Sequence, residues 1–180
     1  SKSNLSFDGN VENLLLYIFG VSKKIYINGY LFSSNTDFKE LMKILDTGGE
    51  EKNDEYVFPD WLDVNLKIKA NNFKYGKFES NNLESEIKYD SKKHHLSARK
   101  TKMNSLNGNI DGEINYYENK IHDLILKANL NLTKIDISKA FENFENFNQD
   151  FIESNNIKGN ANMNLYIQSI WDREYNLYEE

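Results

Sequence analysis

The alternation of apolar and polar residues that decides the fold is clearest over residues 106–116, LNGNIDGEINY. Leu106, Ile110, Ile114 and Tyr116 share one parity with two glycines, and Asn, Asp or Glu occupy the positions between them. Successive side chains of a β-strand point to opposite faces of a sheet. This period of two therefore predicts a strand with one apolar face and one wetted face.

The same period of two recurs along most of the chain. The other predicted strands carry their alternating apolar residues over positions 5–11, 25–31, 64–70, 83–89, 96–98, 124–132 and 157–167. Most breaks between these strands are short, and a short link joins antiparallel neighbours, because a parallel crossover needs a dozen or more residues. The sequence therefore predicts a mainly β fold, built as a long antiparallel meander sheet with one apolar face.

Three stretches interrupt the alternation and are predicted as short helices packed on the sheet: residues 13–19, 37–45 and 136–152. Asp37 and Asp136 stand where an N-cap carboxylate would accept backbone N–H groups. Four phenylalanines follow one broad side of the third stretch, namely Phe141, Phe144, Phe147 and Phe151. We expect this stripe either to pack on the sheet or to line an apolar groove.

Two segments share a layout at an offset of 99 residues, 31–42 and 130–141. Each has a strand end, a polar bend, an Asp cap and a helix start, which is typical of arrays of repeated units that extend along one axis. Glycines and charged residues at 48–55 place a soft boundary near residue 58. We predict a strand-and-helix unit over 1–58 and a β-rich unit over 59–180, either separate or joined in one continuous sheet.

Composition excludes several classes of function. The 180 residues carry a net charge of −6, and nucleic-acid binding by a general basic face is not expected, because phosphate contacts need clustered Lys and Arg. The chain has no Cys, which excludes disulfides, cysteine nucleophiles and Cys-ligated zinc. The longest uncharged apolar run, residues 14–20, is far shorter than the ~20 residues that cross a bilayer.

The sequence shows no persuasive catalytic constellation, so we expect no enzyme, no cofactor and no metal site. His94 and His95 are adjacent, and adjacent residues of a strand point to opposite faces, so the pair is badly placed to hold one metal ion. We expect both histidines to be solvated at the end of a hairpin.

Three short helices are too few to cover about eight long strands. This mismatch favours a curved, groove-like sheet with a partly open apolar interior, although a second sheet closing a sandwich would also hide the apolar face. The residues expected to form the floor of such a groove are Leu66, Ile68, Ile87, Ile110, Ile114, Leu126, Leu130, Met163 and Leu165.

Several motifs carry a family resemblance. They are LKIKANNFKYGKFE at 66–79, LESEI at 83–87, NGNIDG at 107–112, IDISKAF at 135–141, NFNQDFI at 146–152 and NIKG at 156–159. Together, over residues 60–170, they resemble the AsmA-like C-terminal region of Bacteroidetes-type bacteria. Asn148 departs from the pattern, since a Gly is expected before the Gln-Asp-Phe run.

The resemblance implies a place and a role. AsmA-like proteins are large envelope proteins of Gram-negative bacteria, usually anchored in the inner membrane by an N-terminal helix, with most of the chain in the periplasm. They look like bridge-type lipid transporters and are linked to outer-membrane biogenesis. The chain is then expected to be a fragment whose groove carries or shields phospholipid or another acyl lipid.

The alternative is a non-catalytic β-rich scaffold or interaction module with a dry core. In that case the exposed edges of the sheet would pair with a neighbour, and edge-strand pairing is also expected of the isolated fragment.

Overall fold

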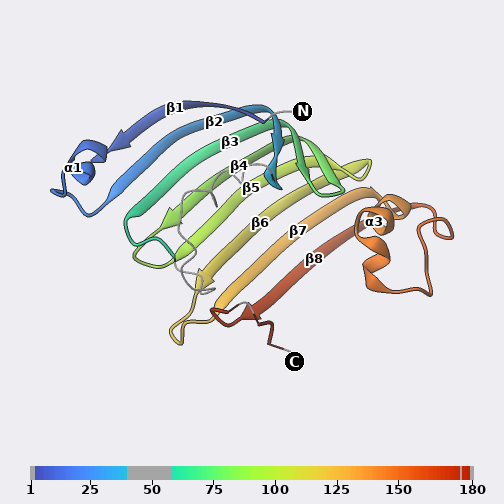
Figure 1. Cartoon of the computed structure of the whole chain (residues 1–180). Helices are drawn as coiled ribbons and strands as arrows, with labels where there is room; N and C mark the ends of the chain where they lie inside the picture. The colour runs from blue at the N-terminus through green and yellow to red at the C-terminus, as the bar shows by residue number, and fades with distance from the viewer. Residues whose placement is uncertain (1–2, 40–57, 175, 179–180) are drawn as a thin grey trace.

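The computed structural model describes residues 3–39, 58–174 and 176–178, which form one open sheet of eight strands (Figure 1). The strands lie side by side in chain order. They are β1 (Asn4–Glu12), β2 (Ile25–Asp37), β3 (Leu62–Tyr75), β4 (Phe78–Asp90), β5 (His95–Ser105), β6 (Gly108–Glu118), β7 (Leu124–Asp136) and β8 (Asn160–Trp171). The prediction of a mainly β fold is confirmed.

The sheet is mixed, because β2 and β3 run parallel while every other neighbouring pair is antiparallel. The prediction of a wholly antiparallel meander is therefore wrong at this pair. Residues 38–61 separate the two strands, and a link of that length can return the chain to the same end of the sheet. The short connections, from β3 to β4, β4 to β5, β5 to β6 and β6 to β7, all join antiparallel strands, as expected.

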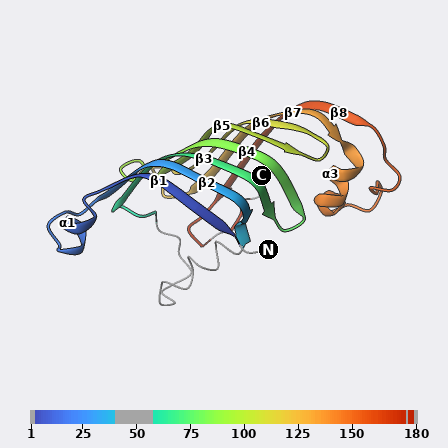
Figure 2. The ribbon, with the colours of Figure 1, turned by 90° about the horizontal axis from the view of Figure 1, so that it is seen from above.

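Bulges interrupt the strands β4, β5 and β7. The register shifts beside Asn82 in β4, Lys100 in β5 and Lys134 in β7, and each of these residues has a left-handed φ, between 51° and 56°. An extra residue in one strand bends it and increases its twist. Figure 2 shows the resulting bow of the sheet from above. Each bulge shifts the alternation by one residue, so the apolar residues before and after it lie on the same face of the sheet.

Helix α3 (Ile137–Asn143) begins at its predicted cap, because the Asp136 carboxylate accepts the backbone N–H of Lys139 at 3.3 Å. The prediction of a helix up to residue 152 is wrong beyond Asn143. The segment η1 (Glu145–Asn148) has a left-handed φ at all four residues, which ends the α-helical path.

Helix α1 (Leu14–Ile18) connects β1 to β2 and lies at the opposite end of the sheet from α3 (Figures 1 and 2). It extends beyond the ends of the strands instead of lying on a face of the sheet, so the expectation that the helices pack on the sheet is wrong for α1 (Figure 1). Most of the predicted helix over 37–45 falls outside the described residues. Within them, the Asp37 carboxylate accepts the N–H of Lys39 at 3.0 Å, which is the start of such a cap.

The internal repeat has a counterpart in the strands. β2 and β7 have the same length, and both of their ends are separated by 99 residues. Each pairs antiparallel with the strand before it, through the register Phe7 with Leu31 and Gly112 with Leu130. The two hairpins therefore match in pairing as well as in sequence layout. The division at residue 58 stays a prediction, although β2 and β3 belong to one sheet.

Two clusters of buried apolar side chains lie at opposite ends of the sheet. Leu106, Ile110, Leu132 and Ile135 form one, against which Ala140 of α3 packs. Phe58, Tyr89 and Leu124 form the other, close to where β3 and β7 begin. We call these the α3 end and the Phe58 end of the sheet.

Candidate functional site

The register of the strands places the predicted groove residues on one face. Leu66 pairs with Ile87, and the same row continues through Ala98, Ile114, Ala128 and Ile167 on β5 to β8. Residues two apart on a strand share a face. All nine predicted floor residues consequently lie on this face, which we call the apolar face.

The apolar face is only partly covered. Of the nine residues, Ile110 is buried, whereas Met163 and Leu165 on β8 are 42% and 38% exposed. The other six are half-buried. Leu130 packs against the cluster of the α3 end, and smaller residues of the same face, such as Ser85, Thr101 and Ala128, are buried in its middle.

The opposite face of the sheet is charged. Lys67 and Lys69 of β3 pair with Glu86 and Glu84 of β4, and the Lys69 Nζ lies 2.8 Å from the Glu84 Oε1. Lys100 of β5 reaches the same Glu86 at 2.9 Å. Such exposed ion pairs contribute roughly 0–1 kcal/mol each to stability, so their main effect is to keep this face in water.

Three of the four stripe phenylalanines meet, although not on one continuous helix. The ring of Phe147 lies 5.0 Å from that of Phe141 and 5.6 Å from that of Phe144, because η1 folds back on α3. The Phe144 ring also lies 6.2 Å from Phe78, which contacts the buried cluster of the α3 end. Phe151 stays apart and is 83% exposed.

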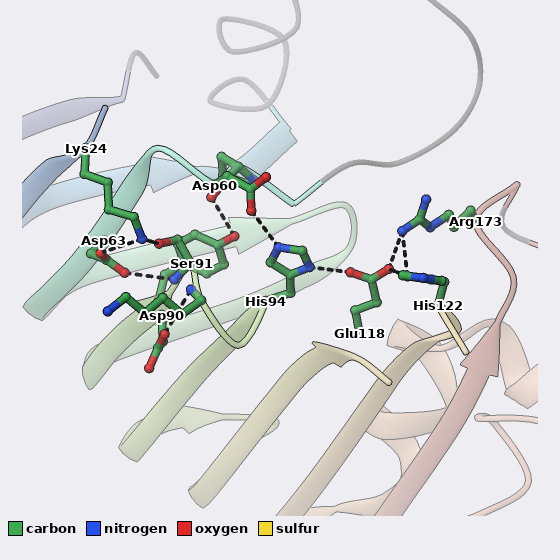
Figure 3. Close-up of polar contacts among 12 residues, drawn as sticks. Lys24, Asp60, Asp63, Asp90, Ser91, His94, Glu118, His122 and Arg173 are labelled. Carbon is green, nitrogen blue, oxygen red and sulfur yellow. Dashed lines mark hydrogen bonds and ion pairs between the residues drawn. The ribbon is translucent and has the colours of Figure 1, made fainter. Parts of the chain in front are cut away.

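A polar cluster at the Phe58 end was not predicted from the sequence (Figure 3). Its centre is Glu118 at the end of β6, whose side chain is 6% exposed. The Glu118 carboxylate contacts His94 Nδ1, His122 Nδ1 at 2.5 Å and Arg173 Nη2 at 2.5 Å. His94 Nε2 reaches Asp60 Oδ1 at 2.8 Å. The expectation of a solvated His94 is therefore wrong.

The groups of this cluster stabilise one another in their charged forms. Burial by itself would raise the pKa of Glu118, but hydrogen bonds from Arg173, His94 and His122 lower it to about 2. Hydrogen bonds to Asp60 and Glu118 raise the pKa of His94. Carboxylates only accept hydrogen bonds, so His94 can donate to both of them only as the protonated imidazolium. These contacts tie the β4–β5 turn, the end of β6, the β6–β7 turn and the segment after β8 together.

His95 points to a different partner, the Asn115 side chain at 3.0 Å. Among the described residues, no group of three or more His, Asp and Glu side chains has an arrangement that would hold a metal ion. In the same part of the chain, no helix is long and apolar enough to span a membrane.

Comparisons with family models, curated proteins and solved structures found no match to this chain. The resemblance to the AsmA-like region therefore stays a prediction, and the face and the cluster have to be interpreted from their own chemistry.

Proposed function

We propose that the apolar face binds the acyl chains of a lipid, and that the chain is a periplasmic segment of an AsmA-like envelope protein that carries or shields lipid in outer-membrane biogenesis. The anchoring of the parent protein in the inner membrane belongs to the same proposal. The location and the family follow from the sequence resemblance, whereas the binding of acyl chains is argued from the face itself.

The observation that carries the proposal is the row of aliphatic side chains across β3 to β8, which are half-buried except for the buried Ala128. Neighbouring strands lie about 4.8 Å apart, so the row is a near-continuous hydrocarbon strip. Each CH₂ group that leaves water on this strip contributes roughly 0.8 kcal/mol. Because similar side chains repeat from strand to strand, a bound acyl chain should have a similar affinity at each position along the strip and no strongly preferred site.

Native mass spectrometry with dioleoyl phosphatidylethanolamine tests this function. Leu66→Asp and Leu165→Asp place a charge on the apolar face, whereas Lys67→Asp and Tyr166→Asp change the adjacent residue on the opposite face. Lipid occupancy should fall strongly in the first pair and stay near the wild-type level in the second. Thermal unfolding of all four variants checks that each of them is folded.

Equal loss of lipid in both pairs would contradict the assignment of the face. A wild-type protein that stays free of lipid after incubation would reject lipid binding by these residues.

A second candidate function, the non-catalytic scaffold, is favoured by one observation. Every residue of the edge strand β1 is exposed, and its apolar Leu5, Phe7 and Val11 are 52%, 42% and 41% exposed. An unprotected edge of this kind is a template for a further strand. Concentration-dependent self-association that is lost in Phe7→Lys, together with absence of bound lipid, would support the scaffold.

A further inference from the structure

The connection between β1 and β2 carries an unusual amount of exposed apolar surface. Residues 14–21 contain no charged side chain. Leu15 is 67% exposed, Ile18 65%, Phe19 75% and Val21 73%. Leu14 and Leu16 are 43% and 47% exposed. We call residues 14–21 the apolar tip, and it projects from the sheet at the end opposite α3 (Figures 1 and 2).

The apolar tip has no polar side. Consecutive helical residues are about 100° apart, so the five residues of α1, all apolar or aromatic, point around the full circle. A helix that docks into a groove on another protein needs one apolar stripe and a polar back. A helix that is apolar all round belongs in a medium that surrounds it on every side, such as the hydrocarbon of a bilayer.

The residues at the base of the apolar tip suit the boundary between lipid and water. The Tyr17 ring lies 5.7 Å from the ring of Trp61, which precedes β3 and is 43% exposed. Tyr and Trp are enriched at the headgroup level of membranes. Lys23 follows the tip and is exposed, so its ammonium group can reach lipid phosphates.

We propose that the apolar tip inserts into one leaflet of a lipid bilayer, with Tyr17 and Trp61 at the headgroup level. Apolar surfaces that bind at a membrane interface reach about 5–10 Å into the boundary between headgroups and acyl chains, and the five residues of α1 span about 7.5 Å. The tip would hold the Phe58 end of the sheet at the membrane surface. This proposal is independent of whether the apolar face takes up lipid, because it rests on the tip alone.

The test is flotation of the whole chain with vesicles of dioleoyl phosphatidylcholine. Leu15→Glu/Phe19→Glu should abolish flotation, since both side chains are exposed and their replacement removes no core contact. Phe151→Glu is the matched control, because Phe151 is 83% exposed near the opposite end of the sheet. It should float as the wild type does. Binding driven by apolar insertion should also persist in high salt, where attraction between charges is screened.

Fluorescence gives an independent readout of the same event. In a Trp171→Phe background, Trp61 is the remaining tryptophan of the chain. Its emission should shift to shorter wavelength when vesicles are added, and the shift should disappear in Leu15→Glu/Phe19→Glu.

Three results would overturn the proposal. One is a wild-type protein that does not float, and another is equal flotation of the double variant. The third is a wild type that self-associates without vesicles and loses this association in the double variant, because the tip would then contact a second copy of the chain. Lipid extracted from the vesicle-free protein tests only the apolar face, so the two proposals can fail separately.

Discussion

Glu118 illustrates how single residues stabilise the Phe58 end of the sheet. Its nearly buried carboxylate would be costly without partners, and three donors from three different parts of the chain surround it. Parity along a strand predicts that a residue lies on one face, but it carries no information about contacts between residues 24 or 55 positions apart. This explains why the nine apolar candidates could be assigned to one face from the sequence, whereas the Glu118 cluster could not.

Glu118→Gln should lower stability in a pH-dependent way. The pKa of Glu118 is about 2 in the folded chain and about 4.5 when unperturbed, so its ionised form stabilises the fold above pH 4.5. This contribution, about 3 kcal/mol at most, is lost as the pH falls through about 2. Urea unfolding from pH 2 to 7 should show the largest difference from wild type above pH 4.5. Glu113→Gln, an exposed residue of the same strand, is the control, and an identical loss there would contradict the role of Glu118.

At the scale of elements, the aromatic stripe over 136–152 shows where periodicity misleads. Phenylalanines three or four residues apart predict a helical face, and the structure does bring three of them together. The helix nevertheless ends at Asn143, because the residues of η1 take left-handed φ angles and turn the chain back. Two of these residues are Asn146 and Asn148, and Asn tolerates that conformation better than most residues. Folding back brings the rings into contact without extending the helix, while Phe144 and Phe147 stay 45% and 55% exposed.

Asp136→Ala should destabilise α3 by about 0.5–2 kcal/mol, the usual cost of removing an N-cap. The carboxylate accepts hydrogen bonds from the Ser138 hydroxyl at 2.7 Å, from the Lys139 N–H and from the Asn107 amide. Amide exchange of residues 137–143 should accelerate more than exchange in β3. Glu142→Ala, at an exposed position near the C-terminal end of the helix, is the control, and equal acceleration in that variant would contradict the capping role.

At the scale of the whole molecule, the β2–β3 ladder joins the parts of the chain on either side of residue 58. The parallel pairing runs from Ile25 with Leu62 to Asp37 with Lys74, and the Ile25 N–H donates to the Trp61 carbonyl at 2.8 Å. A ladder of this length couples β1 and β2 to the rest of the sheet. Unfolding of one part would expose the edge of the other, which favours a single transition.

Single-tryptophan variants should therefore report coincident unfolding in urea. Trp61 senses the junction of α1 and β3 through Tyr17, whereas Trp171 lies at the end of β8. Trp61→Phe and Trp171→Phe should give transitions that overlap once each curve is corrected for the stability of its variant. An earlier transition at Trp61 would show instead that residues 1–58 unfold as a separate unit.

The sequence by itself determined the mainly β class, most strand positions, the common face of the nine aliphatic candidates and the cap at Asp136. These features depend on local order, because side-chain parity and capping follow from residues a few positions apart. Only the tertiary structure decided that β2 and β3 run parallel, that the 136–152 stretch folds back, that Glu118 gathers its three partners and that residues 14–21 stay exposed. The parallel pairing and the Glu118 cluster depend on a long connection and on contacts between distant segments. The fold-back and the exposure of residues 14–21 depend on backbone angles and on where the sheet ends, and none of these features leaves a periodic trace in the sequence.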